Sequence, residues 1–363
     1  MKSKSVITTT QMFILLFVSR ITSNIAYTPM VSKTNNILDF TVSALISFVL
    51  TLVMLIPAYL ISKKTHTLNL LDYSYEVMGK FGSIFAIVIG LYFLFTCVYS
   101  LTMFDVFVGN IASPELSLGV LSVAILVAAY YGATKGIEAI ARTSGIIFVL
   151  ILIAIVFISS ALIPKIDPIN FEPIMYNGVS SVTNGVLLML SQSVCIPAIM
   201  MLLTYVKGNM KKGMLWWSVA IYASYMVVIV IIVGALGDYL KSQTFPVYSA
   251  ASTAEIGVLK NLDSLYIGIW TSGLFIKITL FLYLFALCIE KLFGKKASKI
   301  VTFLGGIVIA AASTMMSEFK YIFSGLFNLN LLFIATLIVA TILPTILLIT
   351  DKFKHIRSMK YEN

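Results

Sequence analysis

Residues 188–197 read LMLSQSVCIP and interrupt the sixth of ten long apolar stretches in this chain. The first apolar stretch has a comparable feature, SRITSNIAYTP at residues 19–29, in which a polar cluster again precedes a proline. Small polar side chains compete with the backbone for hydrogen bonds, and proline removes a donor from a helix. We therefore predict that the first and sixth apolar helices are each broken near mid-length.

The composition is that of a membrane protein. The chain has 363 residues and a mean hydropathy of +1.01, with 60% hydrophobic and 11% charged residues, which excludes an ordinary soluble domain. We expect an all-α polytopic membrane protein with ten transmembrane helices, most of them near the roughly 20 residues that cross a hydrocarbon core. The predicted spans are about 11–30, 40–62, 83–109, 116–132, 140–163, 182–205, 214–236, 264–289, 297–314 and 328–350.

Basic residues predict the orientation, because Lys and Arg near span ends are retained on the cytoplasmic side. With the N-terminus inside, 18 of the 25 Lys and Arg residues fall on the cytoplasmic side and 5 on the other. Both termini are therefore predicted to be cytoplasmic. The net charge of +10 is attributed to these loops, which face anionic lipid headgroups, and not to a nucleic-acid partner.

The spans divide into two halves that enter the membrane from opposite sides. We predict a single transmembrane domain over residues 1–363, with a first repeat at about 8–163, a second at about 182–350 and a short cytoplasmic tail at 351–363. Such opposition defines an inverted repeat, and broken helices are tolerated in a bilayer only where they line a buried cavity. A five-plus-five inverted repeat with broken first and sixth helices follows, with its ligand site at the breaks.

Charged residues inside spans are further candidates, because a charge at the bilayer centre costs about 2.5–3.5 kcal/mol. Lys277 lies midway along the eighth span and should face the bundle interior. It would be a fixed cation where this architecture can place a sodium ion, a counter-charge to a ligand carboxylate, or a structural cap for freed carbonyls. Arg20 is expected to snorkel to the cytoplasmic interface in preference to bonding freed carbonyls. Asp105, near the outer end of its span, is expected to be an interfacial or capping aspartate.

The breaks supply groups that suit a small zwitterion. A half-helix N-terminus attracts a carboxylate, and nearby hydroxyls and amides can orient an amine. Aromatic residues at helical spacing on the third span can wall the pocket. The alternative is a kink whose polar residues only satisfy the backbone. The predicted ligand-binding set is Thr22, Ser23, Asn24, Ile25, Tyr92, Phe95, Tyr99, Leu190, Ser191, Gln192, Ser193, Lys277 and Thr279.

Signatures of an enzyme are missing from the sequence. The two histidines, His66 and His355, both fall in cytoplasmic segments, and no glycine-rich phosphate loop is present. The three cysteines, Cys97, Cys195 and Cys288, lie in apolar spans and are interpreted as packing residues. We therefore expect no catalytic residues, no metal site and no cofactor.

Several segments carry a resemblance to a known family. The most specific are FPVYS at 245–249, LDSL at 262–265 and FIKITLFLY at 275–283, supported by GIEAIAR at 136–142. Over this spacing the chain resembles the endospore germination permeases, the B subunits of spore germinant receptors, within the amino acid–polyamine–organocation superfamily. It departs from them at Thr22, Ser23 and Asn24, where glycines are usual, and at Lys260-Asn261, where an acidic–arginine pair is common.

The resemblance implies a leucine-transporter-like ten-helix fold and residence in the spore inner membrane or cell membrane. It also implies a receptor subunit that binds a small nutrient, most often an amino acid, assembles with A and C subunits and triggers germination. A secondary amino acid transporter or antiporter with the same pocket is the alternative. An ion or water pathway gated by the bundle is a third interpretation.

Overall fold

The computed structural model describes residues 7–26, 39–65, 68–109, 118–171, 178–243, 245–256, 259–260, 262–319 and 328–361. The described helices are α1 (Thr9–Ala26), α2 (Asp39–Met54), α3 (Ile56–Lys64), α4 (Leu70–Met78), α5 (Gly82–Phe107), α6 (Leu118–Thr134), α7 (Ile137–Leu162), α8 (Gly178–Ser191), α9 (Cys195–Leu202), α10 (Met210–Leu236), α11 (Pro246–Thr253), α12 (Asp263–Glu318), α14 (Leu329–Leu337) and α15 (Leu343–Tyr361). Two short strand pairs join them, β1 (Ile7–Thr8) with β2 (Val206–Lys207) and β3 (Glu255–Ile256) with β4 (Leu259–Lys260).

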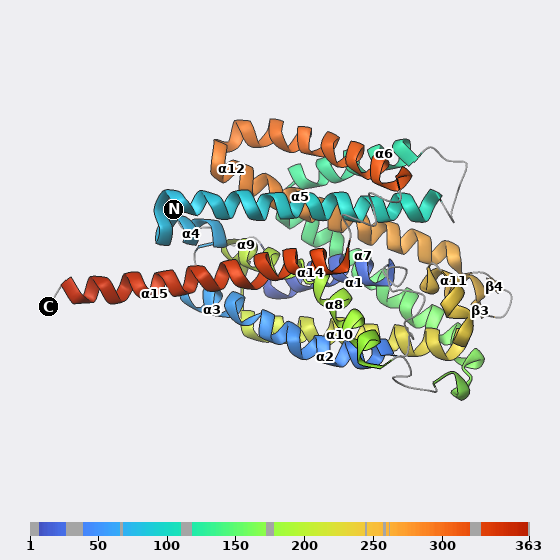
Figure 1. Ribbon diagram of the computed structural model, residues 1–363. Helices are drawn as coiled ribbons and strands as arrows, with labels where there is room; N and C mark the ends of the chain where they lie inside the picture. Colours follow the sequence, from blue (N-terminus) through green and yellow to red (C-terminus); the bar gives the residue numbers. More distant parts are fainter. Residues whose placement is uncertain are drawn as a thin grey trace.

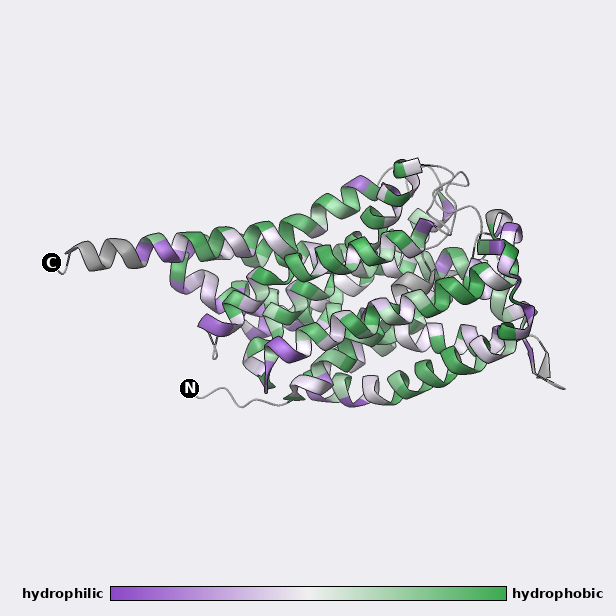
Figure 2. Ribbon diagram, turned by 90° about the horizontal axis from the view of Figure 1, so that it is seen from below, coloured by the Kyte–Doolittle hydropathy of each residue, from purple (hydrophilic) through white to green (hydrophobic). Residues whose placement is uncertain are grey.

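The helices form an elongated bundle in which most of them run along one common direction (Figure 1). Apolar residues follow the length of the helices, and hydrophilic residues gather toward the two ends (Figure 2). The described chain begins and ends at the same end of this bundle, as two perpendicular views agree (Figures 1 and 2). This arrangement is the one that an even number of crossings produces.

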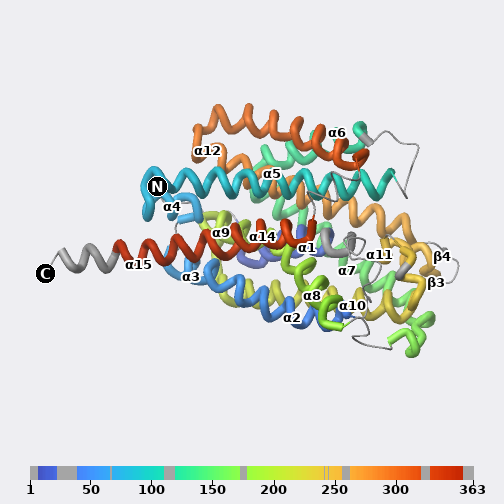
Figure 3. Tube along the Cα trace, viewed as in Figure 1, coloured from blue at the N-terminus to red at the C-terminus, as the bar shows by residue number. Residues whose placement is uncertain are grey.

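Within the described ranges, seven helical segments are long and apolar enough to cross a membrane, and two shorter apolar helices lie at 9–22 and 119–134. One of the seven, α12, is 56 residues long and bends at Gly294, whose φ of 84° is a left-handed conformation that favours glycine. Its two arms lie against each other, since a Cβ on Gly305 would meet the Phe285 ring at 3.0 Å (Figure 3). The predicted count of ten crossings remains a prediction.

The first and sixth apolar segments differ at their polar clusters. In the sixth, α8 ends at Ser191, residues 192–194 form a turn, and α9 begins at Cys195. In the first, α1 stays helical through Thr22, Ser23 and Asn24 and ends at Ala26, so these three polar residues belong to the helix. Residues 27–38, with Pro29, lie outside the described ranges, so the pairing of two breaks remains a prediction.

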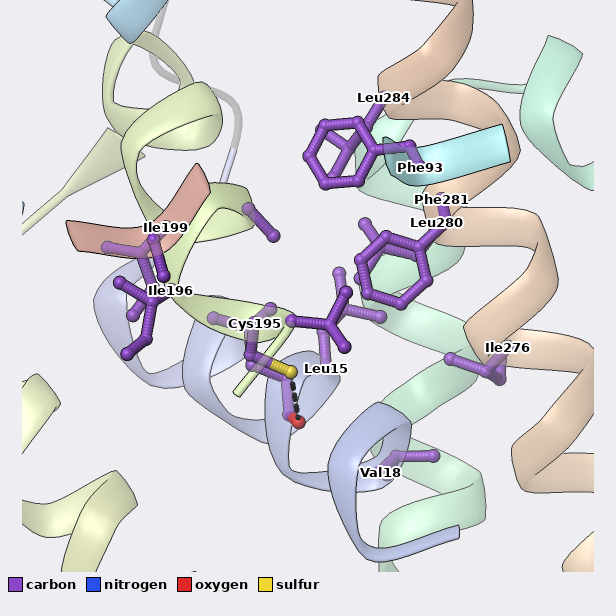
Figure 4. Packing of buried hydrophobic residues seen from close by; sticks show 14 of the residues in the cluster. Leu15, Val18, Phe93, Cys195, Ile196, Ile199, Ile276, Leu280, Phe281 and Leu284 are labelled. Atoms are coloured by element: carbon purple, nitrogen blue, oxygen red, sulfur yellow. Dashed lines mark hydrogen bonds between the residues drawn. The ribbon is translucent and has the colours of Figure 1, made fainter. Parts of the chain in front are cut away.

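The sixth segment occupies the centre of the bundle. In an apolar 18-residue window within residues 178–205, 94% of the residues are buried within the protein, against 28% in such a window within residues 137–165. Figure 4 shows Cys195, at the start of α9, facing α1, with Ile276 and Leu280 of α12 across from it. The Cys195 thiol donates to the Leu16 carbonyl at 3.5 Å (Figure 4). The three cysteines are buried and free, as packing residues should be.

The short segments at the bundle ends are ordered by polar contacts. The 62–80 segment contains α4, capped by Asn69, whose side chain accepts from the Asp72 amide at 2.8 Å. Asp72 also accepts from Lys291 of α12 at 2.6 Å. At the other end of the bundle, α11 packs beside the β3–β4 hairpin (Figure 1). These contacts hold the short connecting segments in place at the two ends of the bundle and do not extend to its centre.

Candidate functional site

All of the last four backbone carbonyls of α8 accept hydrogen bonds at the interruption. The last four carbonyls of a helix have no partner within it, and here each accepts from a different donor. The Leu188 carbonyl accepts from the Ser191 hydroxyl at 2.7 Å, and the Leu190 carbonyl accepts from the Ser193 amide at 2.9 Å. The Met189 carbonyl accepts from Arg20 at 3.4 Å, and the Ser191 carbonyl accepts from the Thr336 hydroxyl at 2.9 Å. The interruption is therefore stabilised by donors from α1 and α14 as well as by its own residues.

Arg20 lies inside the bundle and does not snorkel. Its side chain is 1% exposed, and it also donates to the Tyr222 hydroxyl at 2.9 Å. The guanidinium carbon sits 5.2 Å from the Trp217 ring centroid and 5.3 Å from that of Tyr222. Aromatic faces attract a cation, so these rings of α10 hold the charge where lipid or water was expected to do so. Arg20 is thus a structural bridge between α1, α8 and α10.

Asp105 lies two residues before the end of α5. Its carboxylate is fully buried there and accepts a hydrogen bond from the Ser122 hydroxyl of α6. This bond links the two helices, and the depth of Asp105 in the membrane remains a prediction.

A small cavity adjoins the interruption. It is lined by residues of α5, the 191–194 turn, α12 and α14, namely Tyr92, Phe95, Thr96, Tyr99, Ser191, Gln192, Val194, Lys277, Leu332 and Thr336. Lys277 is 2% exposed, and none of these described lining residues is acidic. The cavity volume is about 10 Å³, which is close to the space that a single water needs. The site is therefore closed in this conformation.

Aromatic side chains form one wall of the cavity. Phe95 and Tyr99 stack with ring centroids 6.4 Å apart and planes 10° from parallel. The Tyr92 hydroxyl hydrogen-bonds the Thr336 hydroxyl at 2.8 Å, so α5 and α14 meet at the cavity edge. A π-helical turn at Ile338–Ile342 follows two residues later. Such turns occur frequently at functional sites because they break the regular hydrogen-bond ladder.

The structure brings six of the predicted site residues into this lining, namely Tyr92, Phe95, Tyr99, Ser191, Gln192 and Lys277. Leu190 and Ser193 are buried at the same interruption but do not line the cavity, and the Ser193 hydroxyl has no hydrogen-bond partner among the described atoms. The binding role of these residues remains a prediction.

Other predicted residues lie elsewhere. The Thr22 hydroxyl donates to the Val18 carbonyl of its own helix at 2.6 Å, and Trp270 donates to the Thr22 carbonyl at 3.0 Å. Thr279 donates to the Phe275 carbonyl and faces Gly132 of α6, away from the cavity. The side chains of Ser23, Asn24 and Ile25 lie outside the described part of the chain.

Four lining residues were missed by the sequence prediction, namely Thr96, Val194, Leu332 and Thr336. Thr96 follows Tyr92 by four residues and so lies on the same helical face, a signal that could have identified it. Val194 directly follows the predicted cluster. Leu332 and Thr336 carry no comparable signal, because a single hydroxyl in an apolar helix does not reveal which neighbour it faces.

A family model described as spore germination protein matches residues 6–320. The chain belongs to the spore germination permease family. Similar proteins include spore germination proteins YndE and KB of Bacillus subtilis (strain 168), 22% identical over 231 residues and 26% identical over 238 residues, each match covering 62% of this chain. Spore germination protein XB of Bacillus anthracis is 25% identical over 208 residues, or 56% of this chain. The matches cover 64%, 63% and 57% of these relatives' own lengths, less than two thirds of each.

A solved structure supports the fold of this chain. The chain resembles a Na⁺-coupled sialic acid symporter in its substrate-bound outward-open state, with a TM-score of 0.63 and 13% identity over 88% of this chain and 75% of the symporter. That symporter has the leucine-transporter-like fold. At this identity the likeness concerns the fold alone. With its apolar helices and family membership, the chain is an integral membrane protein of a permease family.

Proposed function

We propose that this chain is the membrane subunit of a spore germinant receptor that binds a small nutrient amino acid beside the α8–α9 interruption. The observation that carries the proposal is the position of Lys277, a buried lysine that lines this cavity together with Ser191 and Gln192 of the turn. Ionisable residues inside membrane spans are rare and usually mark a ligand or ion site. A ligand carboxylate in the cavity would lie beside this lysine.

The remaining lining suits the rest of such a ligand. The Gln192 side chain and the Ser191 hydroxyl offer polar atoms at the turn, and the N-terminal end of α9 carries partial positive charge toward a carboxylate. Phe95 and Tyr99 offer apolar surface for an aliphatic side chain. This division into one charged end and one apolar wall is typical of sites for small amphiphilic molecules.

Binding would require the cavity to open. An amino acid is several times larger than the single water for which the cavity of about 10 Å³ has room. Separation of α14 from α5 would break the bond between Tyr92 and Thr336 and enlarge the space, and the π-helical turn after Thr336 offers a place for α14 to bend. A ligand that binds only the open form shifts the population toward it.

In the receptor hypothesis, that shift is the germination signal. It would pass to A and C partner subunits in the spore inner membrane, with both ends of the chain on the cytoplasmic side. The end of the bundle that holds both chain ends offers ordered contacts for such transmission, including the salt bridge between Asp72 of α4 and Lys291 of α12.

The alternative is a secondary amino acid transporter or antiporter. The likeness of the fold to a Na⁺-coupled symporter favours it, since that architecture is compatible with alternating access. Both hypotheses use the same cavity. Ligand-driven uptake into liposomes by the isolated chain would favour the transporter, and binding without uptake would favour the receptor.

A panel test addresses the site directly. The purified full chain would be assayed for a rise in unfolding temperature with each of the twenty proteinogenic amino acids. Amino acids that bind should lose affinity at least about 30-fold in Lys277→Met, because the ligand carboxylate would be buried without its partner. Lys299→Met is the matched control, since Lys299 is an exposed lysine of the same helix.

A second variant keeps the test decisive if Lys277→Met folds poorly. Thr96→Leu adds apolar volume to the cavity without changing any charge and should also abolish the response. The proposed site would be contradicted if amino acids still raised the unfolding temperature of both folded variants. It would also be contradicted if no amino acid of the panel raised the unfolding temperature of the unaltered chain.

A further inference from the structure

A second, larger hollow lies at the end of the bundle that holds both chain ends. Its volume is about 530 Å³, and it is bounded by the start of α1, the middle of α7, the 207–209 loop and the first half of α10. We call it the lysine groove, because Lys207 and Lys212 line it at one end. Phe17, Phe148 and Ala220 line it at the other. It is distinct from the cavity at the α8–α9 interruption and shares no lining residue with it.

The fold builds the polar end of the groove from chain segments about 200 residues apart. Strand β1 pairs in parallel with β2, which places Ile7 opposite Val206 and Thr8 opposite Lys207. The Thr9 hydroxyl donates to the Lys207 carbonyl at 3.0 Å. A Cβ on Gly208 would meet the Thr9 hydroxyl at 2.3 Å, so glycine is needed for this approach. The lysine backbone is therefore held in place.

The apolar end of the groove runs along the helices toward the membrane interior. Ala220 lies ten residues after the start of α10 and Phe148 eleven after the start of α7. At 1.5 Å per residue, Ala220 lies about 12 Å along α10 from Lys212, and Phe148 lies about 16 Å along α7 from its start. The Phe17 and Phe148 rings pack edge to face at 5.2 Å and form the wall there. The groove thus changes from cationic to apolar along its length.

The surroundings place the polar end at a membrane interface. Trp216 lines the groove and is 70% exposed, and tryptophan is enriched where lipid headgroups meet the hydrocarbon. The described residues that line the groove include no Asp or Glu. Basic pockets between transmembrane helices on the cytoplasmic side are known to bind anionic headgroups, and the distribution of lysines predicts that this end is cytoplasmic.

We propose that the lysine groove binds an anionic phospholipid. Its phosphodiester would lie between Lys207 and Lys212, and an acyl chain would follow Phe17, Phe148 and Ala220 into the membrane. A soluble anion would use the lysines but would leave the apolar length unfilled. The inference is independent of the proposed germinant site, because neither Lys277 nor the α8–α9 turn takes part in it.

Lipid titrations of the purified full chain, followed by native mass spectrometry, test the proposal. Dioleoyl phosphatidylglycerol and dioleoyl phosphatidylcholine have the same acyl chains, so a difference between them reports the headgroup. We expect tighter binding of the anionic lipid. The double variant Lys207→Gln and Lys212→Gln should lose about 30-fold in that affinity, because each lysine near an anionic surface contributes roughly a factor of five.

Two further variants control the charge and the shape of the groove. Lys296→Gln with Lys299→Gln removes the same charge from exposed positions of α12 and should leave binding unchanged. Ala220→Trp fills the apolar end at an exposed position and should weaken binding of the anionic lipid with both lysines intact.

Three results would overturn the proposal. The first is equal affinity for the two lipids in the unaltered chain. The second is unchanged affinity in the groove double variant. The third is competition by glycerophosphoglycerol, the headgroup without acyl chains, at the same concentration as the intact lipid, which would identify a site for soluble anions instead.

Discussion

The first and sixth apolar segments contain similar sequence features and fold differently at them. Both have a polar cluster followed by a proline, yet α1 continues through Thr22–Asn24 to Ala26, whereas the sixth segment stops at Ser191 and resumes at Cys195. In α1 the Thr22 hydroxyl bonds back to the Val18 carbonyl, four residues earlier in the same helix. A hydroxyl used in this way leaves the helical ladder intact.

The sixth segment differs because other helices supply its missing partners. Arg20 of α1 and Thr336 of α14 donate to the carbonyls of Met189 and Ser191, which a continuous helix would have used internally. An unpaired buried carbonyl costs about 1–3 kcal/mol, so an interruption at the centre of the bundle persists only where such donors exist. The comparison teaches that a polar cluster permits a break and that tertiary donors decide whether it forms.

Of the substitutions proposed, replacing Arg20 should destabilise the α8–α9 interruption most. Arg20→Ala removes the donor to the Met189 carbonyl and one of two hydrogen-bond partners of the Tyr222 hydroxyl, which also bonds Thr51, and it opens a cavity beside Trp217. We expect a loss of about 3 kcal/mol in the free energy of unfolding, measured on the detergent-solubilised protein.

Arg142→Ala is the control for Arg20. The Arg142 side chain is 72% exposed and pairs with Glu138 one turn away, so its loss should cost less than about 0.5 kcal/mol. Equal stability of the two variants would show that the guanidinium of Arg20 does not hold the α8 end.

Thr336→Val should have an intermediate effect. Valine keeps the shape of threonine but cannot donate to the Ser191 carbonyl or bond the Tyr92 hydroxyl. We expect a loss of about 1 kcal/mol, in the range measured for hydrogen bonds between membrane helices. Thr350→Val, at a partly exposed residue whose hydroxyl donates to the Ile346 carbonyl of its own helix, is the matched control. If both substitutions cost the same, the contact between α14 and the interruption is unimportant.

Thr22→Val should have the smallest effect. The Thr22 hydroxyl bonds its own helix, so valine removes no bond that holds α1 to its neighbours. We expect a change within about 0.5 kcal/mol in the unfolding free energy and unchanged helix content by circular dichroism. If Thr22→Val lost as much unfolding free energy as Thr336→Val, the Thr22 hydroxyl would stabilise the bundle as much as the Thr336 hydroxyl does. That result would contradict the difference described between the first and sixth segments.

The sequence predicted the features that depend only on residues close together in the chain. The cost of a buried charge pointed to Lys277, and helical spacing placed Tyr92, Phe95 and Tyr99 on one face. The polar run before Pro197 located the interruption to within the residues that form the turn. Each of these inferences uses only neighbours along the chain, so no knowledge of tertiary contacts was needed.

The sequence did not predict contacts between residues that lie far apart in the chain. Arg20 was expected to snorkel because nothing nearby could hold its charge, but the rings of Trp217 and Tyr222 approach from α10, nearly 200 residues away. Thr336 and Leu332 line the cavity although most of its other residues lie far from them in the chain, so the sequence did not predict them. The sequence also did not show that Thr22, Ser23 and Asn24 stay helical, because it does not reveal which carbonyls find donors elsewhere.

A structure of the full chain with a bound amino acid tests the central claim most directly, using the member of the panel that raises the unfolding temperature most. We predict that the amino acid lies between the Lys277 ammonium and residues 192–194, in a cavity larger than the closed one, with α8 and α9 still separate. An amino acid bound elsewhere, or a helix wound without interruption from Gly178 to Leu202, would contradict the account.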